Sequence, residues 1–399
     1  MKFTPYDETI KILKAHTPKW DRVEKVTLTN ALNRYLAKDI EAKQSYPTCE
    51  TSSMDGYALK FDESRNKYKI LGDAPAGELR EIKLKDDECV KTFTGALMAK
   101  NSDTLVPIEN VEIKGSTLHI VKPVPKGKAV RVVGESYKKG EILLKKGTKI
   151  SYSEIALLAE LGEFYVSVFV KPKVAILATG NEIKDLGEPL ENETQIRSSN
   201  HVALAAIVEL MGCEPIILPI VKDEPTAVSS AIINALKSCD ILLTTGGVSV
   251  GDYDFVKGTL RDNFEVIIDG SAIKPGRHIK IAKSGDKFIF ALPGFPYSAM
   301  VMCVLYARRL INSYFCNEKS YIFNAILDED FTKQSNFLEF TACNVTSKKN
   351  GELRVNLSGK KRGSSAIVNN LNKNAFLLIT PLEYKGYKAG EVVKVLKMP

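Results

Sequence analysis

Residues 240–254, DILLTTGGVSVGDYD, decide the fold of the central part of the chain. The apolar run at 241–243 is typical of a buried strand, and it leads directly into a glycine-rich loop. Two further strand patterns precede it, KVAILA at 173–178 and EPIILPIV at 214–221. Helical patterns of about 10–15 residues separate the strands, and this alternation predicts βαβ units with a parallel sheet.

The helices expected between these strands are HVALAAIVELMG at 201–212 and DEPTAVSSAIINALKSC at 223–239. Ser199-Asn200 is the expected N-terminal cap of the first, and Gly212 is its expected stop. A later strand, a Pro-Gly loop and a helix follow in GDKFIFALPGFPYSAM at 285–300.

The flanking regions have other patterns. Residues 4–38 are predicted to be helical, with a first helix starting near Thr4-Pro5 and a second at Leu28 to Leu36. Between about 57 and 130, short strand patterns separated by turn residues indicate a small β module. Strand patterns return after Asn317, which predicts a small C-terminal β domain.

The bulk composition is that of a globular protein of 399 residues with a formal net charge of +8. The charge favours anionic partners or reflects a lysine-rich solvated surface, and no Lys/Arg block suggests nucleic-acid binding. The N-terminus lacks the features of a signal peptide, and the longest apolar run, 299–307, is too short to span a membrane. Seven scattered cysteines without a C-x-x-C pair favour free thiols in the cytoplasm and make a zinc cluster unexpected.

Three strand-to-helix loops carry the candidate chemistry: ATGNE at 178–182, TTGGVSVGDYD at 244–254 and LPGFP at 292–296. Ligands of open α/β sheets bind outside the carboxyl ends of the strands. The loop with Thr245, Gly246, Gly247 and Ser249 offers unshielded backbone amides, so it is either a phosphate cradle or a tight turn. It matches neither a P-loop nor a dinucleotide fingerprint.

Acidic residues lie in the same loops. Glu182, Asp223 and Asp254 are candidates for binding Mg²⁺, which takes a few carboxylates plus substrate oxygens, or they are ordinary acids at helix N-termini. Lys274-Pro275-Gly276-Arg277 is either an oxyanion site or a solvated turn. Outside this module, Asp55 in SSMDGYA (52–58) and Thr94 in FTGA (93–96) occupy what local physics favours as structural turns.

Seven segments together closely resemble the molybdopterin molybdenumtransferase family, which includes the gephyrin E domain. They are SSMDGYA, FTGA, VRVVGE (130–135), ATGNEI, TTGGVSVGDYDFVK, AIKPGR and LPGFP, in the family's order. The resemblance implies a multidomain α/β and β protein. Its expected parts are a discontinuous mixed and helical domain (1–41 and 131–170), an inserted β domain (42–130), a doubly wound α/β molybdopterin-binding domain (171–318) and a C-terminal β-barrel-like domain (319–399).

The resemblance also implies a reaction. Molybdate is inserted into adenylylated molybdopterin, AMP is released with the assistance of Mg²⁺, and the enzyme is a homodimer whose active site lies between subunits. Asp55 and Thr94 would then come from the partner subunit, and Glu182, Asp223 and Asp254 would hold the metal or act in the molybdate step. The expected substrate-binding residues are Thr245, Gly246, Gly247, Ser249, Lys274, Pro293, Gly294 and Pro296. No nucleic acid or membrane partner is expected, whereas other cofactor-synthesis proteins or molybdoenzymes are possible partners.

Several positions depart from the family pattern: Ser136, Gly270, His278, Phe295 and Glu339. They keep open a non-catalytic cofactor-binding or scaffold paralogue on the same fold. The upstream adenylylation reaction is a further alternative, although it needs only the α/β module. The sequence does not choose between molybdate and tungstate.

Overall fold

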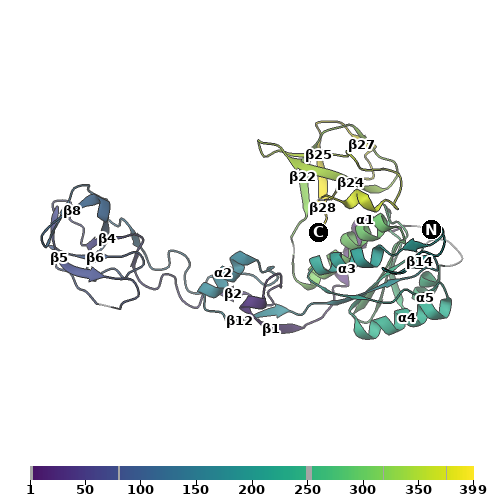
Figure 1. The fold of residues 1–399 in the computed structure, drawn as a ribbon, viewed down its shortest axis with the longest axis horizontal. Helices are drawn as coiled ribbons and strands as arrows, with labels where there is room; N and C mark the ends of the chain where they lie inside the picture. The colour runs from purple at the N-terminus through teal and green to yellow at the C-terminus, as the bar shows by residue number, and fades with distance from the viewer. Residues whose placement is uncertain (1–2, 80, 249–253, 318, 374) are drawn as a thin grey trace. The chain divides into compact units, whose positions relative to one another are not determined.

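The computed structural model describes residues 3–79, 81–248, 254–317, 319–373 and 375–399. The chain divides into two compact units (Figure 1). The larger unit comprises residues 1–37, 147–155 and 165–399, and the smaller unit comprises residues 38–146 and 156–164. The finer four-domain division stays a prediction. Within the described part of the chain, no helix is both long and apolar enough to cross a membrane.

A six-stranded sheet forms the centre of the larger unit, in the order β16-β13-β17-β21-β20-β18. Its strands are β13 (Lys173–Ala178), β16 (Glu214–Ile217), β17 (Ile241–Thr245), β18 (Glu265–Asp269), β20 (Lys280–Ser284) and β21 (Lys287–Leu292). The first four in spatial order run parallel, and β20 and β18 extend the sheet antiparallel. The predicted parallel sheet is therefore confirmed, with an antiparallel extension at one side.

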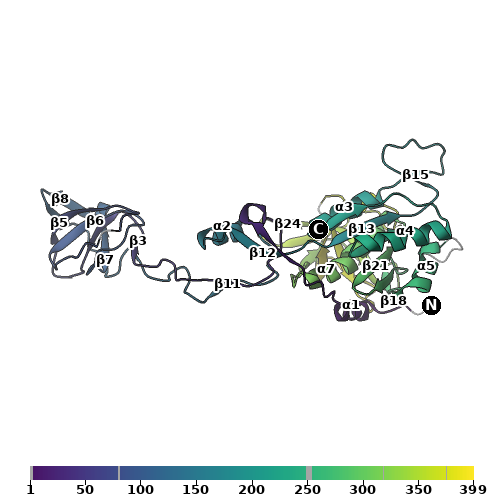
Figure 2. The same cartoon turned by 90° about the horizontal axis from the view of Figure 1, so that it is seen from below.

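Helices cover both faces of this sheet. One face packs α1 (Tyr6–Ala15), α3 (Asn200–Leu210), α6 (Pro296–Met302), η3 (Cys303–Ala307) and α7 (Arg308–Tyr314) into a shared apolar core. The other face packs α4 (Pro225–Ser238) and α5 (Phe255–Asn263), which Figures 1 and 2 show side by side. The doubly wound α/β class is confirmed. Gly212 has a φ of 85° just after α3, as its expected stop requires, whereas Ser199 makes no side-chain capping hydrogen bond.

The prediction of a helical N-terminal region is wrong after α1. Residues 23–27 form β1 (Val23–Thr27), which pairs antiparallel with β12 (Tyr165–Phe169). Only η1 (Leu28–Asn30) is helical in the segment from Leu28 to Leu36. Asn33 has a φ of 63°, which ends any helix there, and Tyr35 and Leu36 instead make β-bridges.

The C-terminal part of the larger unit is a closed barrel. Its strands are β22 (Ile322–Leu327), β24 (Leu338–Ser347), β25 (Leu353–Asn356), β26 (Phe376–Thr380) and β28 (Val392–Lys397). The ring closes because β24 pairs with both β25 and β26. Short elements accompany it: β19 (Ile273–Lys274), β23 (Phe331–Thr332), β27 (Gly386–Tyr387) and η4 (Val368–Leu371). β19 pairs with β24, so the Lys274 turn lies against the barrel.

The smaller unit contains a six-stranded sheet in the order β7-β4-β6-β5-β9-β8. Its strands are β4 (Gly56–Leu59), β5 (Lys67–Ala74), β6 (Glu88–Thr92), β7 (Thr104–Pro107), β8 (Val111–Lys114) and β9 (Thr117–Ile120). Shorter elements are β2 (Ile40–Glu41), β3 (Thr51–Ser52), β10 (Val130–Arg131), β11 (Ile142–Leu144) and η2 (Ile108–Asn110), while α2 (Tyr152–Glu160) includes residues of both units. The predicted β module is confirmed.

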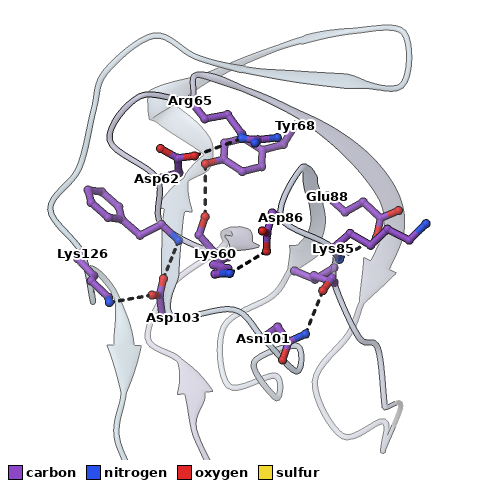
Figure 3. Close-up of polar contacts among 12 residues, drawn as sticks. Lys60, Asp62, Arg65, Tyr68, Lys85, Asp86, Glu88, Asn101, Asp103 and Lys126 are labelled. Carbon is purple, nitrogen blue, oxygen red and sulfur yellow. Dashed lines mark hydrogen bonds and ion pairs between the residues drawn. The ribbon is translucent and has the colours of Figure 1, made fainter.

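Polar contacts connect the loops of this sheet (Figure 3). Asp103 accepts a hydrogen bond from the backbone N–H of Phe61 at 2.8 Å and pairs with Lys126 at 3.3 Å. Lys60 pairs with Asp86 at 2.8 Å, although both side chains are exposed. Exposed pairs of this kind contribute little stability, so the buried apolar strands hold the sheet together.

Candidate active site

The cleft of the larger unit lies where the strand order of the sheet reverses. From β13 the chain passes through α3 to β16 on one side, and α4 then carries it back to β17 on the other side of β13. Loops that leave two such strands diverge, which opens a crevice at their carboxyl ends. A cleft of about 1010 Å³ lies there. The barrel contributes Ser335, Phe337, Ser365, Ala366 and Val368 to its lining.

Residues from all three predicted loops line this one cleft. The predicted site residues among them are Glu182, Thr245, Gly246, Gly247, Lys274, Pro293, Gly294 and Pro296. Asp223 and Asp254 are not part of the lining, and Ser249 falls outside the described residues. The geometry therefore brings the loops together, while the roles of these residues stay predictions.

Gly246 and Gly247 shape the floor of the cleft. Gly246 has a φ of 97°, and a Cβ there would lie 2.8 Å from the carbonyl oxygen of Thr179. Gly247 has a φ of 64°, and a Cβ there would lie 2.8 Å from Cγ2 of Val256. Only glycine satisfies both the dihedral and the space, so both positions require glycine for the loop to take this course along the cleft.

Three polar side chains beside this loop each carry a buried oxygen that no described residue pairs with: Thr179 and Thr244 stand in the loops that the sequence singled out, whereas Asn200 was missed as a site residue. Thr179 Oγ1, Thr244 Oγ1 and Asn200 Oδ1 are buried and have no hydrogen-bond partner among the described residues. Asn200 also donates from Nδ2 to the carbonyl oxygen of Gly294 at 2.7 Å, which fixes the Pro-Gly loop against the start of α3. Buried polar atoms are rarely unpaired, so Thr179 and Asn200, which line the cleft, are candidates for contact with a bound ligand, whereas Thr244 does not line it. Asn200 was expected only as a helix cap, and its tertiary partner leaves no local sequence signal.

The three predicted acids influence one another electrostatically. Burial and the nearby charge of Glu182, followed by that of Asp254, raise the pKa of Asp223. Asp254 is the N-cap residue of α5 but makes no side-chain capping bond, and its Oδ2 is buried without a hydrogen-bond partner in the described structure. The alternative of Asp254 as an ordinary helix cap is thus not supported by its contacts. Among described residues, no three His, Cys, Asp or Glu side chains already converge at metal-ligand spacing.

Replacing Glu182 by glutamine is expected to lower the pKa of Asp223, because it removes a like charge. A raised carboxyl pKa in the folded state stabilises the protein below the unfolded pKa, and this contribution is lost as the pH rises through the folded pKa. As the pH rises through the folded pKa of Asp223, the Glu182→Gln variant should therefore lose less of its free energy of unfolding than the wild type does. Carboxyl NMR titration and unfolding at several pH values measure both effects. Glu193→Gln, at an exposed position in the loop between β14 (Ile183–Lys184) and β15 (Ile196–Arg197), is the matched control; an equal shift in both variants would contradict the coupling.

Cationic side chains also line the cleft. Lys274 and Arg277 line the cleft, and burial together with the charge of Arg277 lowers the pKa of His278. Arg277 Nε donates to His278 Nε2 at 3.1 Å, which requires an unprotonated acceptor nitrogen. His278 is therefore a neutral hydrogen-bonding group, and Lys274 and Arg277 supply the positive charge for an anion.

The buried carboxylate of Glu339 lies next to Lys274. Its Oε2 is 4.0 Å from Lys274 Nζ and accepts a hydrogen bond from Ser335 Oγ at 2.8 Å, and its Oε1 accepts one from Thr341 at 3.1 Å. This residue stands where the family resemblance leads one to expect an arginine. Glu339 thus partly neutralises Lys274 instead of adding a second cation.

Three other residues that depart from the family pattern can be placed in the structure. Gly270 has a φ of 102°, and a Cβ there would lie 2.7 Å from the ring of Phe3, so a lysine does not fit without a shift. Phe295 is 60% exposed on the rim of the cleft. Ser136, in the smaller unit, accepts a hydrogen bond from Arg131 at 3.1 Å.

Asp55 and Thr94 form a pair within the smaller unit. Asp55 Oδ1 accepts hydrogen bonds from Thr94 Oγ1 at 2.7 Å and from the Thr94 backbone N–H at 2.8 Å. These two bonds lower the pKa of the exposed Asp55 carboxyl. The next residue must be glycine, because a Cβ on Gly56 would overlap the carbonyl oxygen of Val106. The two motifs that the sequence singled out here thus meet, and their part in a reaction stays a prediction.

Replacing Thr94 by valine is expected to raise the pKa of Asp55, because the hydroxyl donor is lost while the backbone donor remains. A lowered carboxyl pKa stabilises the fold above the unfolded pKa, and this contribution disappears as the pH falls through the folded value. The stability difference between wild type and variant should therefore be present at neutral pH and vanish in acid. NMR titration of Asp55 and acid unfolding measure this; a pKa of Asp55 that does not change would contradict the prediction.

The comparisons with known proteins agree with this architecture. Residues 4–162 match the family model of the MoeA N-terminal region (domain I and II), and residues 175–312 match that of a probable molybdopterin binding domain. A molybdopterin molybdenumtransferase from Bacillus subtilis is 32% identical over 98% of this chain and 93% of its own length. One from a Nostoc species is 30% identical over 98% and 93%, respectively.

Solved structures give the same result for the fold. The molybdopterin biosynthesis MoeA protein from Pyrococcus horikoshii OT3 superimposes with a TM-score of 0.84 at 28% identity, covering 100% of both chains. A second structure of a MoeA protein from this genus gives a TM-score of 0.81 at 26% identity, again over both full chains. The chain therefore belongs to the molybdopterin molybdenumtransferase family of transferases, which act in molybdenum-cofactor biosynthesis.

Proposed function

We propose that this protein transfers molybdenum from molybdate to adenylylated molybdopterin and releases AMP. The observation that carries the proposal is the single cleft lined by residues of ATGNE, TTGGV and LPGFP together with Lys274. Its relatives are named for the transfer of molybdenum to molybdopterin. The cytoplasmic location expected from the sequence is part of the same proposal.

The residues of the cleft suit a phosphorylated ligand. The backbone amide of Gly247 is not shielded by a side chain, and amides of this kind bind phosphate oxygens, whereas the N–H of Gly246 donates to the carbonyl oxygen of Leu292 at 3.3 Å. The unpaired hydroxyl of Thr179 adds a donor, and Lys274 balances negative charge. Pro293, Gly294 and Pro296 form a rigid wall against which the ligand is oriented.

The carboxylates of Glu182, Asp223 and Asp254 are the kind of ligand that a divalent cation prefers. Glu182 and Asp254 raise the pKa of Asp223, and Asp254 Oδ2 is a buried oxygen without a partner in the described residues. A cation held by Glu182, Asp223 and Asp254 would relieve this repulsion, with Mg²⁺ completing its coordination through water and substrate oxygens. When bound, Mg²⁺ neutralises charge on the phosphoanhydride.

We further propose a homodimer in which Asp55 and Thr94 of one subunit complete the cleft of the other. The support within this chain is that Asp55, although exposed, is held in one orientation by two hydrogen bonds from Thr94. A preorganised, exposed carboxylate suits a group that acts outside its own unit. Sedimentation of the purified protein tests the dimer.

The test of the reaction uses purified protein, adenylylated molybdopterin, Mg²⁺ and low molybdate. We expect AMP release together with cofactor that activates an apo-molybdoenzyme, and strongly reduced release in Asp55→Ala and Glu182→Ala. Pterin binding with no AMP release, unchanged in those variants, would instead support the scaffold alternative. ATP-dependent adenylylation of free molybdopterin would support the upstream reaction.

A further inference from the structure

A serine, a histidine and an aspartate form one polar chain at the edge of the cleft. Ser198 follows β15 (Ile196–Arg197), which pairs with β14 (Ile183–Lys184), and it lines the cleft just before α3. Ser198 Oγ is hydrogen-bonded to Nδ1 of His201, in the first turn of α3. Nε2 of the same imidazole lies 3.3 Å from Asp185 Oδ1.

The three residues of this polar chain differ in their exposure to solvent. Ser198 and His201 are each only 4% exposed, whereas the Asp185 side chain is 49% exposed. A carboxylate on Nε2 favours the tautomer with its proton there, which leaves Nδ1 as the acceptor for the serine hydroxyl. This is the order of roles in serine hydrolases, with the two imidazole nitrogens exchanged.

The surroundings of Ser198 favour negative oxygens. The N-cap residue of α3, Ser199, makes no side-chain capping bond, so it does not occupy the amides of the first turn. The helix terminus adds partial positive charge, and Lys274 and Arg277 line the same cleft. An electrophile bound here next to Ser198 would best be a phosphoryl group.

We propose that Ser198, His201 and Asp185 form an activated serine, with Ser198 as a nucleophile toward a phosphoryl group held in the cleft. Ser198 Oγ bonds to phosphorus as the bond from phosphorus to the leaving phosphate oxygen breaks. His201 Nδ1 takes the serine proton and passes it to the leaving phosphate. Water then displaces Oγ, and the proton of this water returns through His201 to Ser198. The phosphoryl class of the substrate rests on the proposed function, but the activation of Ser198 does not.

A fluorophosphonate ester tests the activation without any pterin. Ser198 Oγ would bond to phosphorus, the P–F bond would break, fluoride would leave, and His201 would hold the proton. Peptide mass spectrometry of the intact, full-length protein should locate the label at Ser198. The rate should fall by about 100-fold or more in His201→Gln, which removes the base. Asp185→Asn should also slow labelling, and Ser198→Ala should abolish it.

The matched control is Glu191→Gln, which changes an exposed acid of the same loop that pairs with Lys184 instead of His201. It should be labelled at the wild-type rate. His201 is buried and its variant could unfold, so Asp185→Asn, changed at an exposed carboxylate, carries the test if thermal unfolding shows His201→Gln to be unfolded.

The proposal is overturned if folded wild-type protein stays unlabelled at Ser198 while a serine hydrolase in the same tube is labelled fully. It is equally overturned if labelling proceeds at the wild-type rate in Asp185→Asn and in a folded His201→Gln. Labelling at Ser198 without AMP release from adenylylated molybdopterin would contradict the proposed function but not the activated serine. AMP release without labelling would contradict the activated serine but not the proposed function.

Discussion

Replacing Asp254 by asparagine is expected to lower AMP release by about 100-fold or more, as the loss of a preorganised electrostatic group does. Asp254 Oδ2 is a buried carboxylate oxygen without a hydrogen-bond partner in the described residues, and its charge raises the pKa of Asp223. A carboxylate oxygen that is buried without a partner costs stability, so the substitution should leave the free energy of unfolding unchanged or raise it. Loss of activity with retained or higher stability is the signature of a group kept for function.

The control for this variant is Asp262→Asn. Asp262 lies on the same helix, α5, but is exposed to solvent. It should keep full activity. Kinetics of AMP release and urea unfolding of both variants give the answer, and an Asp254→Asn enzyme with wild-type turnover would remove Asp254 from the proposed site.

Replacing Gly246 by alanine is expected to reduce stability by about 1–3 kcal/mol, the cost of a non-glycine residue in a strained backbone region. At a φ of 97°, the new methyl group would lie 2.8 Å from the Thr179 carbonyl oxygen, which is backbone and cannot rotate away. The loops of β13 and β17 would have to separate. Because the same loops line the cleft, AMP binding should weaken in parallel with stability.

Gly258→Ala is the matched control, because Gly258 lies in the helix α5 and a Cβ there meets nothing within 4 Å. This substitution should stabilise the protein by about 0.5–1 kcal/mol, since alanine is the better helix residue. Urea unfolding and AMP titration of both variants decide the matter. Equal effects of the two substitutions would show that the strain at Gly246 is not what shapes the cleft.

The elements of the central sheet could be predicted because their signals are local. Strands such as 173–178 and 241–245 are built on continuous apolar runs at 174–178 and 241–243, and glycines mark the loops that follow them. The three loops could also be expected to converge, since parallel strands end at the same edge of a sheet.

The N-terminal segment was mispredicted because its buried residues mimic a helix. Ala31 and Tyr35 are buried at a spacing of four, which a helical face would also give. Tyr35 and Leu36 instead make bridges to Lys149 and Val168, which are far away in sequence. Tertiary pairing of this kind overrides local periodicity.

The polar network of the cleft could be predicted only in part. Glycines and acids at strand ends stand out in the sequence, but the partner of a side chain does not. The contacts of Asn200 with Gly294 and of Glu339 with Lys274 each cross many residues. The contact of His201 with Ser198 joins the start of α3 to the residue after β15, and Asp185 lies next to His201 where β14 and β15 pair; none of the three was singled out from the sequence.

The most direct test of molybdenum transfer is a single-turnover experiment that counts both products. Protein, adenylylated molybdopterin, Mg²⁺ and molybdate are mixed, and AMP and pterin-bound molybdenum are quantified in the same sample. We expect equal amounts of AMP and of molybdenum on the pterin, with both greatly reduced in Asp254→Asn. AMP release without molybdenum on the pterin, or neither product from folded wild-type protein, would contradict it.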